Sequence, residues 1–314
     1  MHPSNVKIGQ NEYRTYQLIT LIEEGKIHFE QNIEWNTRHQ SMSIESILLG
    51  LTMTPFYVDA SDPNAWFLLD GNKRLYSLSR FLKGNFCLNS LDFFPNLNGC
   101  YFADLSFGIQ RKLTEAMFKV YTINQGVSAE IRYNLALRIV PDLQKQQNYR
   151  YIETLLDSQC REALKDWLNG SSYDFIKKQF DTKSSYRFVL EYFRIKMSLE
   201  EEAKINLNTP IEQIVFRLNN KGVHGLSSWK RGMERISYLF KDTKHSYLNK
   251  KTIPIWIYIL GEYMGSSQYE EISHHRDIFL EEWANFYLKK ENSRLFTKAN
   301  PKEIYNKMIK WIDQ

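Results

Sequence analysis

The spacing of the apolar residues changes near residue 126, and this change restricts what the chain can fold into. Before it, short apolar runs typical of strands alternate with helical patterns, and beyond it the strand signals fade and helical patterns dominate. Strands and helices in front, followed by helices alone, indicate an α+β protein. We therefore expect a small mixed α/β domain over residues 1–125 and an all-helical domain over residues 126–314.

The first 125 residues carry both kinds of pattern. Apolar runs bounded by turn-forming residues predict three strands, at 55–58, 66–69 and 117–123. Apolar residues spaced by three and four predict three helices, at 16–25, 41–51 and 73–84. The stretch "KIHFEQNIEW" between the first two helices has the pattern of extended chain. Together these elements make the front of the chain α+β.

Helical patterns continue through the rest of the chain. They predict helices over seven ranges: 128–147, 149–168, 184–206, 227–241, 253–264, 275–291 and 301–312. Aromatic residues run through these helices, among them Tyr186, Phe188, Tyr192 and Phe193. We interpret them as core residues because aromatic side chains dominate buried area, with base stacking as the alternative.

Composition and charge narrow the class of protein. With 314 residues, 43% of them hydrophobic, the chain can bury a sizeable core. The net charge of +5 permits a phosphate-bearing partner without requiring one. The three cysteines form no C-x-x-C pair, which favours a reducing compartment. The longest apolar run, residues 253–260, is too short to span a bilayer, so we expect a cytoplasmic protein without a membrane partner.

The stretch "FLLDGNKRLYSL", residues 67–78, is the main candidate for a functional site. Asp-Gly is a common hairpin signal. However, Leu75, Leu78 and Leu82 continue with a helical period, which predicts a strand, a turn and a helix. In that geometry the first amides of the helix have no acceptor within the helix and attract anions. An ordinary structural turn is the alternative.

The residues of this turn have the chemistry of an anion site. Gly71 lets the backbone approach a ligand, while Lys73 and Arg74 add two positive charges. Asp70 by itself would repel phosphate. It can instead accept hydrogen bonds from backbone amides, pair with an arginine or bind Mg²⁺. From these residues alone, an anion site at residues 71–74 and a structural turn both stay open.

Two blocks of the sequence resemble a known family. The first is the order "W-N…I-E-S-I-L-L-G-L…P-F-Y-V…L-L-D-G-N-K-R-L", over roughly residues 29–90, and the second is "I-V-F-R-L-N-N-K-G-V-H-G-L", at residues 214–226. In the second block four residues take the family's places: Phe216, Asn219, Gly222 and Leu226. The first block resembles the N-terminal domain of GmrSD-type modification-dependent restriction enzymes, and the second is similar to a later F-x-x-L-N-x-K-G-V-x-L element of the same family. That family has a DGQQR motif on a ParB/sulfiredoxin-like fold.

This resemblance implies a nucleotide site. The family's DGQQR loop binds nucleoside triphosphates such as ATP, GTP or CTP, and in some members hydrolyses them, often in anti-phage defence. Asp70, Gly71 and Arg74 match the motif. The resemblance gives Asp70 and Arg74 catalytic roles and makes Asp70 the ligand of a Mg²⁺ ion. The chain is thus a candidate nucleoside triphosphatase.

Departures from the motif leave hydrolysis open. Asn72 and Lys73 stand where the family has two glutamines. Asn72 keeps much of the hydrogen bonding of an amide, whereas Lys73 has no acceptor and cannot orient water. The arginine that the family carries before its tryptophan is missing, and Arg38 is the residue here that could replace it. Asn219 either contacts the nucleotide or holds a turn.

We do not expect a nuclease within this chain. GmrSD-type enzymes carry an HNH-like nuclease domain, and its pattern is missing from this sequence. We interpret the pair His274-His275 as a solvated helix start and not as a metal site. Adjacent side chains on a helix point apart, which is a poor geometry for two ligands of one ion. A separate nuclease or another defence subunit is then the expected partner. The alternative function is an inactive adaptor of the same fold that binds DNA or a nuclease through its helical half.

Overall fold

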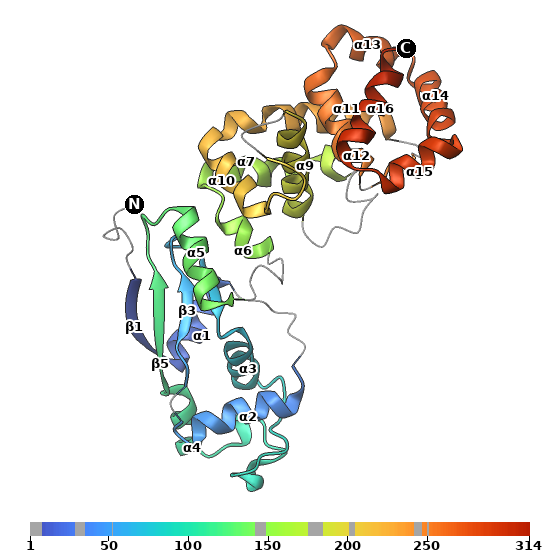
Figure 1. The fold of residues 1–314 in the computed structure, drawn as a ribbon. Coiled ribbons are helices and arrows are strands. Elements are labelled where there is room, and N and C mark those ends of the chain that lie inside the picture. The colour runs from blue at the N-terminus through green and yellow to red at the C-terminus, as the bar shows by residue number, and fades with distance from the viewer. Residues whose placement is uncertain are drawn as a thin grey trace. The chain divides into compact units, whose positions relative to one another are not determined.

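The computed structural model describes residues 8–28, 35–51, 53–141, 149–174, 185–200, 205–241, 247–249 and 251–314 (Figure 1). The chain forms two compact units, Met1–Gln147 and Asn148–Gln314, called here the N-terminal unit and the C-terminal unit. The first combines a mixed sheet with helices, and the second is largely helical. The predicted α+β class is therefore confirmed.

Strands and helices are mixed along the N-terminal unit. Its described elements are β1 (Ile8–Arg14), α1 (Thr15–Glu23), β2 (Ile27–His28), α2 (Thr37–Leu48), β3 (Phe56–Asp59), β4 (Trp66–Asp70), α3 (Asn72–Leu82), η2 (Pro95–Leu97), η3 (Phe102–Asp104), α4 (Phe107–Thr114), β5 (Met117–Ile123) and α5 (Ala129–Ile139). Strand β5 has the bounds predicted from the sequence, and β3, β4 and α3 lie close to theirs. The three predicted strands are therefore confirmed.

The five strands among the described residues form one sheet in the order β1-β5-β3-β4-β2. Strand β5 pairs antiparallel with β1 and parallel with β3, so the last strand along the chain lies inside the sheet. Strand β3 pairs antiparallel with β4, which pairs parallel with β2. Strand β1 was not predicted from the sequence, because this edge strand is largely polar and exposed and shows no alternation of apolar residues.

One face of this sheet packs against helices α1 to α4. The buried cluster joins side chains of β3, β4 and β5 to side chains of these helices, among them Leu18, Ile44, Leu48, Phe56, Val58, Leu68, Leu75, Leu78, Phe81, Leu113, Phe118 and Val120. In α3 the residues Leu75 and Leu78 lie on the buried stripe that the sequence predicts. The helix after the Asp-Gly turn is thus held in place by its apolar face.

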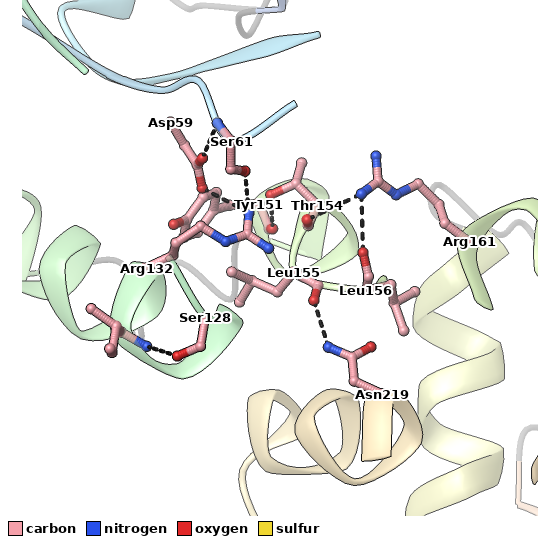
Figure 2. Close-up of polar contacts among 11 residues, drawn as sticks. Asp59, Ser61, Ser128, Arg132, Tyr151, Thr154, Leu155, Leu156, Arg161 and Asn219 are labelled. Atoms are coloured by element: carbon pink, nitrogen blue, oxygen red, sulfur yellow. Dashed lines mark hydrogen bonds and ion pairs between the residues drawn. The ribbon is translucent and has the colours of Figure 1, made fainter. Parts of the chain in front are cut away.

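Helix α5 belongs to the N-terminal unit, although the sequence predicts a boundary at residue 125. The Nη1 atom of Arg132 lies 3.0 Å from Oδ2 of Asp59, at the end of β3, and both side chains are buried. The same nitrogen donates to the hydroxyl of Ser61 at 2.7 Å (Figure 2). A buried ion pair thus ties α5 to the sheet.

All described elements of the C-terminal unit are helical. They are α6 (Tyr149–Thr154), α7 (Ser158–Leu168), α9 (Ser185–Leu199), α10 (Ile211–Lys221), η6 (Val223–Leu226), α11 (Ser227–Phe240), α12 (Thr252–Tyr258), the π-helical turn η7 (Ile259–Tyr263), α13 (Ser266–His274), α14 (Arg276–Leu288), α15 (Lys290–Lys298) and α16 (Pro301–Ile312). Helix α16 has the bounds predicted from the sequence, whereas α10 and α13 were not predicted.

The core of the C-terminal unit is rich in aromatic side chains. Trp256 is fully buried, and its ring centroid lies 5.0 Å from that of Trp283 and 5.7 Å from that of Phe279. A second group lies around Trp229, whose ring contacts Tyr192 at 4.8 Å between centroids. Tyr192 is fully buried. The prediction that these aromatic residues form the core is confirmed for the fully buried ones.

Helix α11 lies unusually close to the segment formed by α12 and η7. A Cβ atom on Gly232 would lie 2.1 Å from the carbonyl oxygen of Ile257, and one on Gly261 would lie 2.4 Å from that of Ser228. No side chain can occupy either position without moving a backbone. The two glycines therefore set how closely these helices pack.

An ion pair stands beside this helix contact. Lys196 on α9 donates to the carboxylate of Glu262 and also lies 3.0 Å from a carboxylate oxygen of Glu200. Lys196 is 8% exposed. Burial by itself would raise the pKa of Glu262, but hydrogen bonds from Lys196 and Ser228 outweigh it and hold that pKa below its ordinary value of 4.5.

The stability of the C-terminal unit is expected to fall in acid, partly through Glu262. Because the folded pKa lies below the unfolded one, the stabilisation is fully present above the unfolded pKa and is lost as the pH falls through the folded pKa. The Glu262→Gln variant should show a weaker pH dependence in urea unfolding between about pH 6 and about pH 3. The exposed residue Glu281 supplies a matched control, Glu281→Gln. A wild-type slope in Glu262→Gln would contradict this account.

Candidate functional site

The candidate site lies where β4 gives way to α3, at Asp70 and Gly71. Gly71 has φ +99°, in the left-handed region that favours glycine. A Cβ atom there would lie 2.2 Å from a ring carbon of Phe56, which is itself buried. The predicted unit of strand, turn and helix is confirmed. The structure also shows that the fold itself requires a glycine at this turn.

Arg74 turns toward the protein interior. Its guanidinium donates to the carbonyl oxygen of Thr54 and, at 3.2 Å, to that of Pro55. It also lies 4.7 Å from the centroid of the Phe56 ring and 3.8 Å from a carboxylate oxygen of Asp70. Burial lowers the pKa of Arg74, and the charge of Asp70 opposes this. The described contacts make Arg74 a residue that positions the turn, and its contact with a phosphate stays a prediction.

The remaining residues of the turn are more open. Lys73 is exposed, and its Nζ lies 5.8 Å from the ring centroid of Trp35. Asn72 donates to the carbonyl of Leu68 at 3.4 Å. The side chain of Asp70 is 51% exposed, and no side chain caps the start of α3. The side-chain groups that face solvent here are thus the ammonium of Lys73 and the carboxylate of Asp70.

The other two predicted ligand residues lie in different units. Arg38 is exposed in the first turn of α2, in the N-terminal unit. Asn219 lies on α10 in the C-terminal unit, where its Nδ2 donates to the carbonyl of Leu155 at 2.8 Å (Figure 2). Its Oδ1 accepts from the amide of Asp157 at 2.9 Å. Asn219 therefore holds the connection between α6 and α7, which supports the turn alternative. Its contact with a nucleotide stays a prediction.

Within the described part of the chain, no group of three or more His, Cys, Asp or Glu residues could hold a metal ion. His274 ends α13 and His275 precedes α14, and both side chains are exposed. Each uses Nδ1 to contact a carbonyl of the preceding turn. Cys87, Cys100 and Cys160 form no disulfide bond. A Mg²⁺ ion at Asp70 would thus depend on oxygens from a bound phosphate and from water, as is common for this ion.

Two cavities open elsewhere in the described residues. One, of about 620 Å³, lies in the C-terminal unit between α13, α14, α15 and α16, and includes Phe286 and Trp311. The other, of about 430 Å³, lies in the N-terminal unit and includes Tyr13 and Trp66. Residues 70–74 line neither of them. Sequence reasoning found neither cavity, because each is built from segments far apart along the chain.

Comparison with protein-family models, curated proteins and solved structures finds no match to this chain. The fold and the turn therefore define the chain only as an α+β protein in which Gly71 starts helix α3 directly after strand β4. Among the described helices, none combines the length and the apolar character that crossing a membrane requires.

Proposed function

We propose that the N-terminal unit binds a nucleoside triphosphate at the start of α3, as the likeness of Asp70, Gly71 and Arg74 to the DGQQR motif implies. The observation that carries this proposal is the first turn of α3, which follows a left-handed glycine and has no capping side chain. The amides of a first helical turn have no acceptor within the helix, and together with the positive end of the helix dipole they favour an anion at such a position. The exposed ammonium of Lys73 adds to this attraction.

Each residue of the turn has a part in this proposal. The first-turn amides and Lys73 contact the phosphates, and Arg74 keeps the turn in shape through Thr54 and Pro55. Asp70 holds a Mg²⁺ ion together with phosphate oxygens, and the ion neutralises phosphate charge when it is bound. Lys73 replaces a glutamine of the motif and cannot orient water, so binding is the core of the proposal and hydrolysis is measured separately.

A Lys73→Ala variant is expected to bind ATP, GTP or CTP about tenfold more weakly, because it loses one charge-assisted hydrogen bond. Titration calorimetry with and without Mg²⁺ measures the effect, and phosphate release measures hydrolysis. Lys119→Ala is the matched control, since Lys119 is exposed on β5 in the same unit. The proposal would be contradicted if the wild type did not bind triphosphate, or if Lys73→Ala and Lys119→Ala bound it equally well. Arg74→Ala is a poor probe because it also removes contacts within the fold.

The second candidate function is an adaptor that keeps the fold without turnover and binds DNA or a nuclease in a defence system. It is favoured by the guanidinium of Arg74, which already donates to two backbone carbonyls, and by the two replaced glutamines. Gel-shift titration with duplex DNA at several salt concentrations tests it, because phosphate contacts weaken steeply with salt. Triphosphate binding without any DNA binding or co-purifying partner would exclude this candidate.

A further inference from the structure

The cavity of about 430 Å³ in the N-terminal unit lies at the other end of β4 from the proposed triphosphate site. Strand β4 begins at Trp66, which lines the cavity, and ends at Asp70. Four residue steps along a strand separate these two residues by about 13 Å. The cavity is therefore a separate place on the same sheet, with a size typical of small-ligand pockets.

One wall of the cavity is aromatic. The rings of Tyr13 on β1 and Trp66 on β4 meet edge to face, with centroids 6.2 Å apart and an interplanar angle of 77°. Both rings are only partly buried. The ammonium of Lys26 lies 4.9 Å from the centroid of the Trp66 ring. This wall thus offers an indole ring with a cation beside it, and a flat ligand can stack on such a ring.

The other lining residues include three amide side chains and a hydroxyl. Asn11 and Gln125 are exposed side chains at the rim, and Thr122 donates to Oδ1 of Asn124 at 2.8 Å. The lack of a side chain at Gly9 leaves room for Thr122 and Asn124, since a Cβ atom at position 9 would lie 2.6 Å from the Thr122 hydroxyl. The residues that line the cavity include one cation and no carboxylate. The chemistry of this site therefore suits a ligand with a hydrogen-bonding edge and a negative charge.

We propose that this cavity binds one unstacked nucleotide of a single-stranded nucleic acid. The base lies against Trp66, as bases do on aromatic side chains of single-strand binders. Asn11 and Gln125 read the base edge, because a carboxamide matches its adjacent donor and acceptor groups. Lys26 moves from the indole face to a phosphate. A neutral saccharide would also suit the ring and the amides, but it would bring no negative charge to the ammonium of Lys26.

The test measures the fluorescence anisotropy of a labelled single-stranded ten-nucleotide DNA with the intact protein. The double variant Asn11→Ala/Gln125→Ala is expected to bind about tenfold more weakly, because two hydrogen-bonding amides are lost. Gln10→Ala is the matched control, since Gln10 is the exposed neighbour of Asn11 on β1 and points to the other face of the sheet. Wild-type affinity in Gln10→Ala supports the proposal, and equal weakening in both overturns it.

Two further comparisons make the result specific. Lys26→Ala should lower the affinity more than Lys119→Ala, although both variants lose one positive charge from the same unit, and equal losses would indicate non-specific attraction and overturn the proposal. Competition of soluble oligosaccharides with the DNA would overturn it as well. The double variant should still bind triphosphate, and Lys73→Ala should still bind DNA. The proposed triphosphate site and the proposed nucleotide cavity can thus be tested independently of each other.

Discussion

A Trp256→Ala variant is expected to lose about 3–5 kcal/mol of unfolding free energy, the range for removing a large aromatic side chain from a core. Trp256 is fully buried, and its ring contacts those of Phe240, Phe279, Trp283 and Trp311. Its removal leaves four rings facing a void that they cannot fill without leaving their own contacts. Urea unfolding followed by circular dichroism measures the loss.

Two comparisons separate this effect from a general sensitivity to mutation. Trp256→Phe keeps an aromatic ring in place and should lose less than the alanine variant. Trp167→Ala removes the same side chain from a partly exposed position on α7, and it should also lose less. If Trp167→Ala were as damaging as Trp256→Ala, the aromatic cluster would not be the centre of stability in the C-terminal unit.

The Gly71→Ala variant is expected to destabilise the N-terminal unit by roughly 2–5 kcal/mol. Part of this loss is the cost of a left-handed backbone for a residue with a Cβ atom, at φ +99°. The rest comes from overlap with Phe56, which is buried and cannot move freely. Thermal unfolding of the variant and the wild type gives the total.

Gly84 provides the control that separates these two contributions. It has φ +69°, but a Cβ atom there would meet nothing within 4 Å. The Gly84→Ala variant should therefore lose only the unfolding free energy that the left-handed backbone conformation costs. Gly71→Ala should therefore lose clearly more than Gly84→Ala, and a double variant with Phe56→Leu should recover part of the difference. Equal losses at the two glycines would mean that the contact with Phe56 does not restrict position 71.

This prediction bears on how the candidate site is read. The glycine and the arginine of the DGNKR turn both serve the fold, through Phe56, Thr54 and Pro55. The loss of ligand binding in a Gly71 or Arg74 variant would therefore not distinguish a binding defect from a folding defect. Lys73 is the residue whose removal does distinguish them, because it is exposed.

Local patterns predicted the elements that bury a regular apolar face. Strand β5 and helix α3 have alternating or helically spaced apolar residues, and both were found from the sequence. Strand β1 was missed because it is a polar edge strand whose only described strand partner, β5, lies a hundred residues away. Its place in the sheet depends on backbone pairing, which leaves little trace in the side chains.

The prediction of the functional site was limited in the same way, because it depended on local patterns. The sequence predicted that the helix after Gly71 would begin with open amides, because periodicity reveals the helix. It could not show that Arg74 donates to carbonyls about twenty residues earlier, nor that Asn219 holds the turn before Asp157. It could not show the cavity at Trp66 either, since the lining residues come from several separate segments. Contacts between distant segments decide these roles.

The place of β5 in the sheet has a consequence for synthesis on the ribosome. Strand β5 separates β1 from β3, so a nascent chain that has not yet emerged to Ile123 leaves both of these strands with an unfilled side. Such open strand edges invite pairing with other chains. The described sheet of the N-terminal unit can therefore be completed only after β5 has been translated.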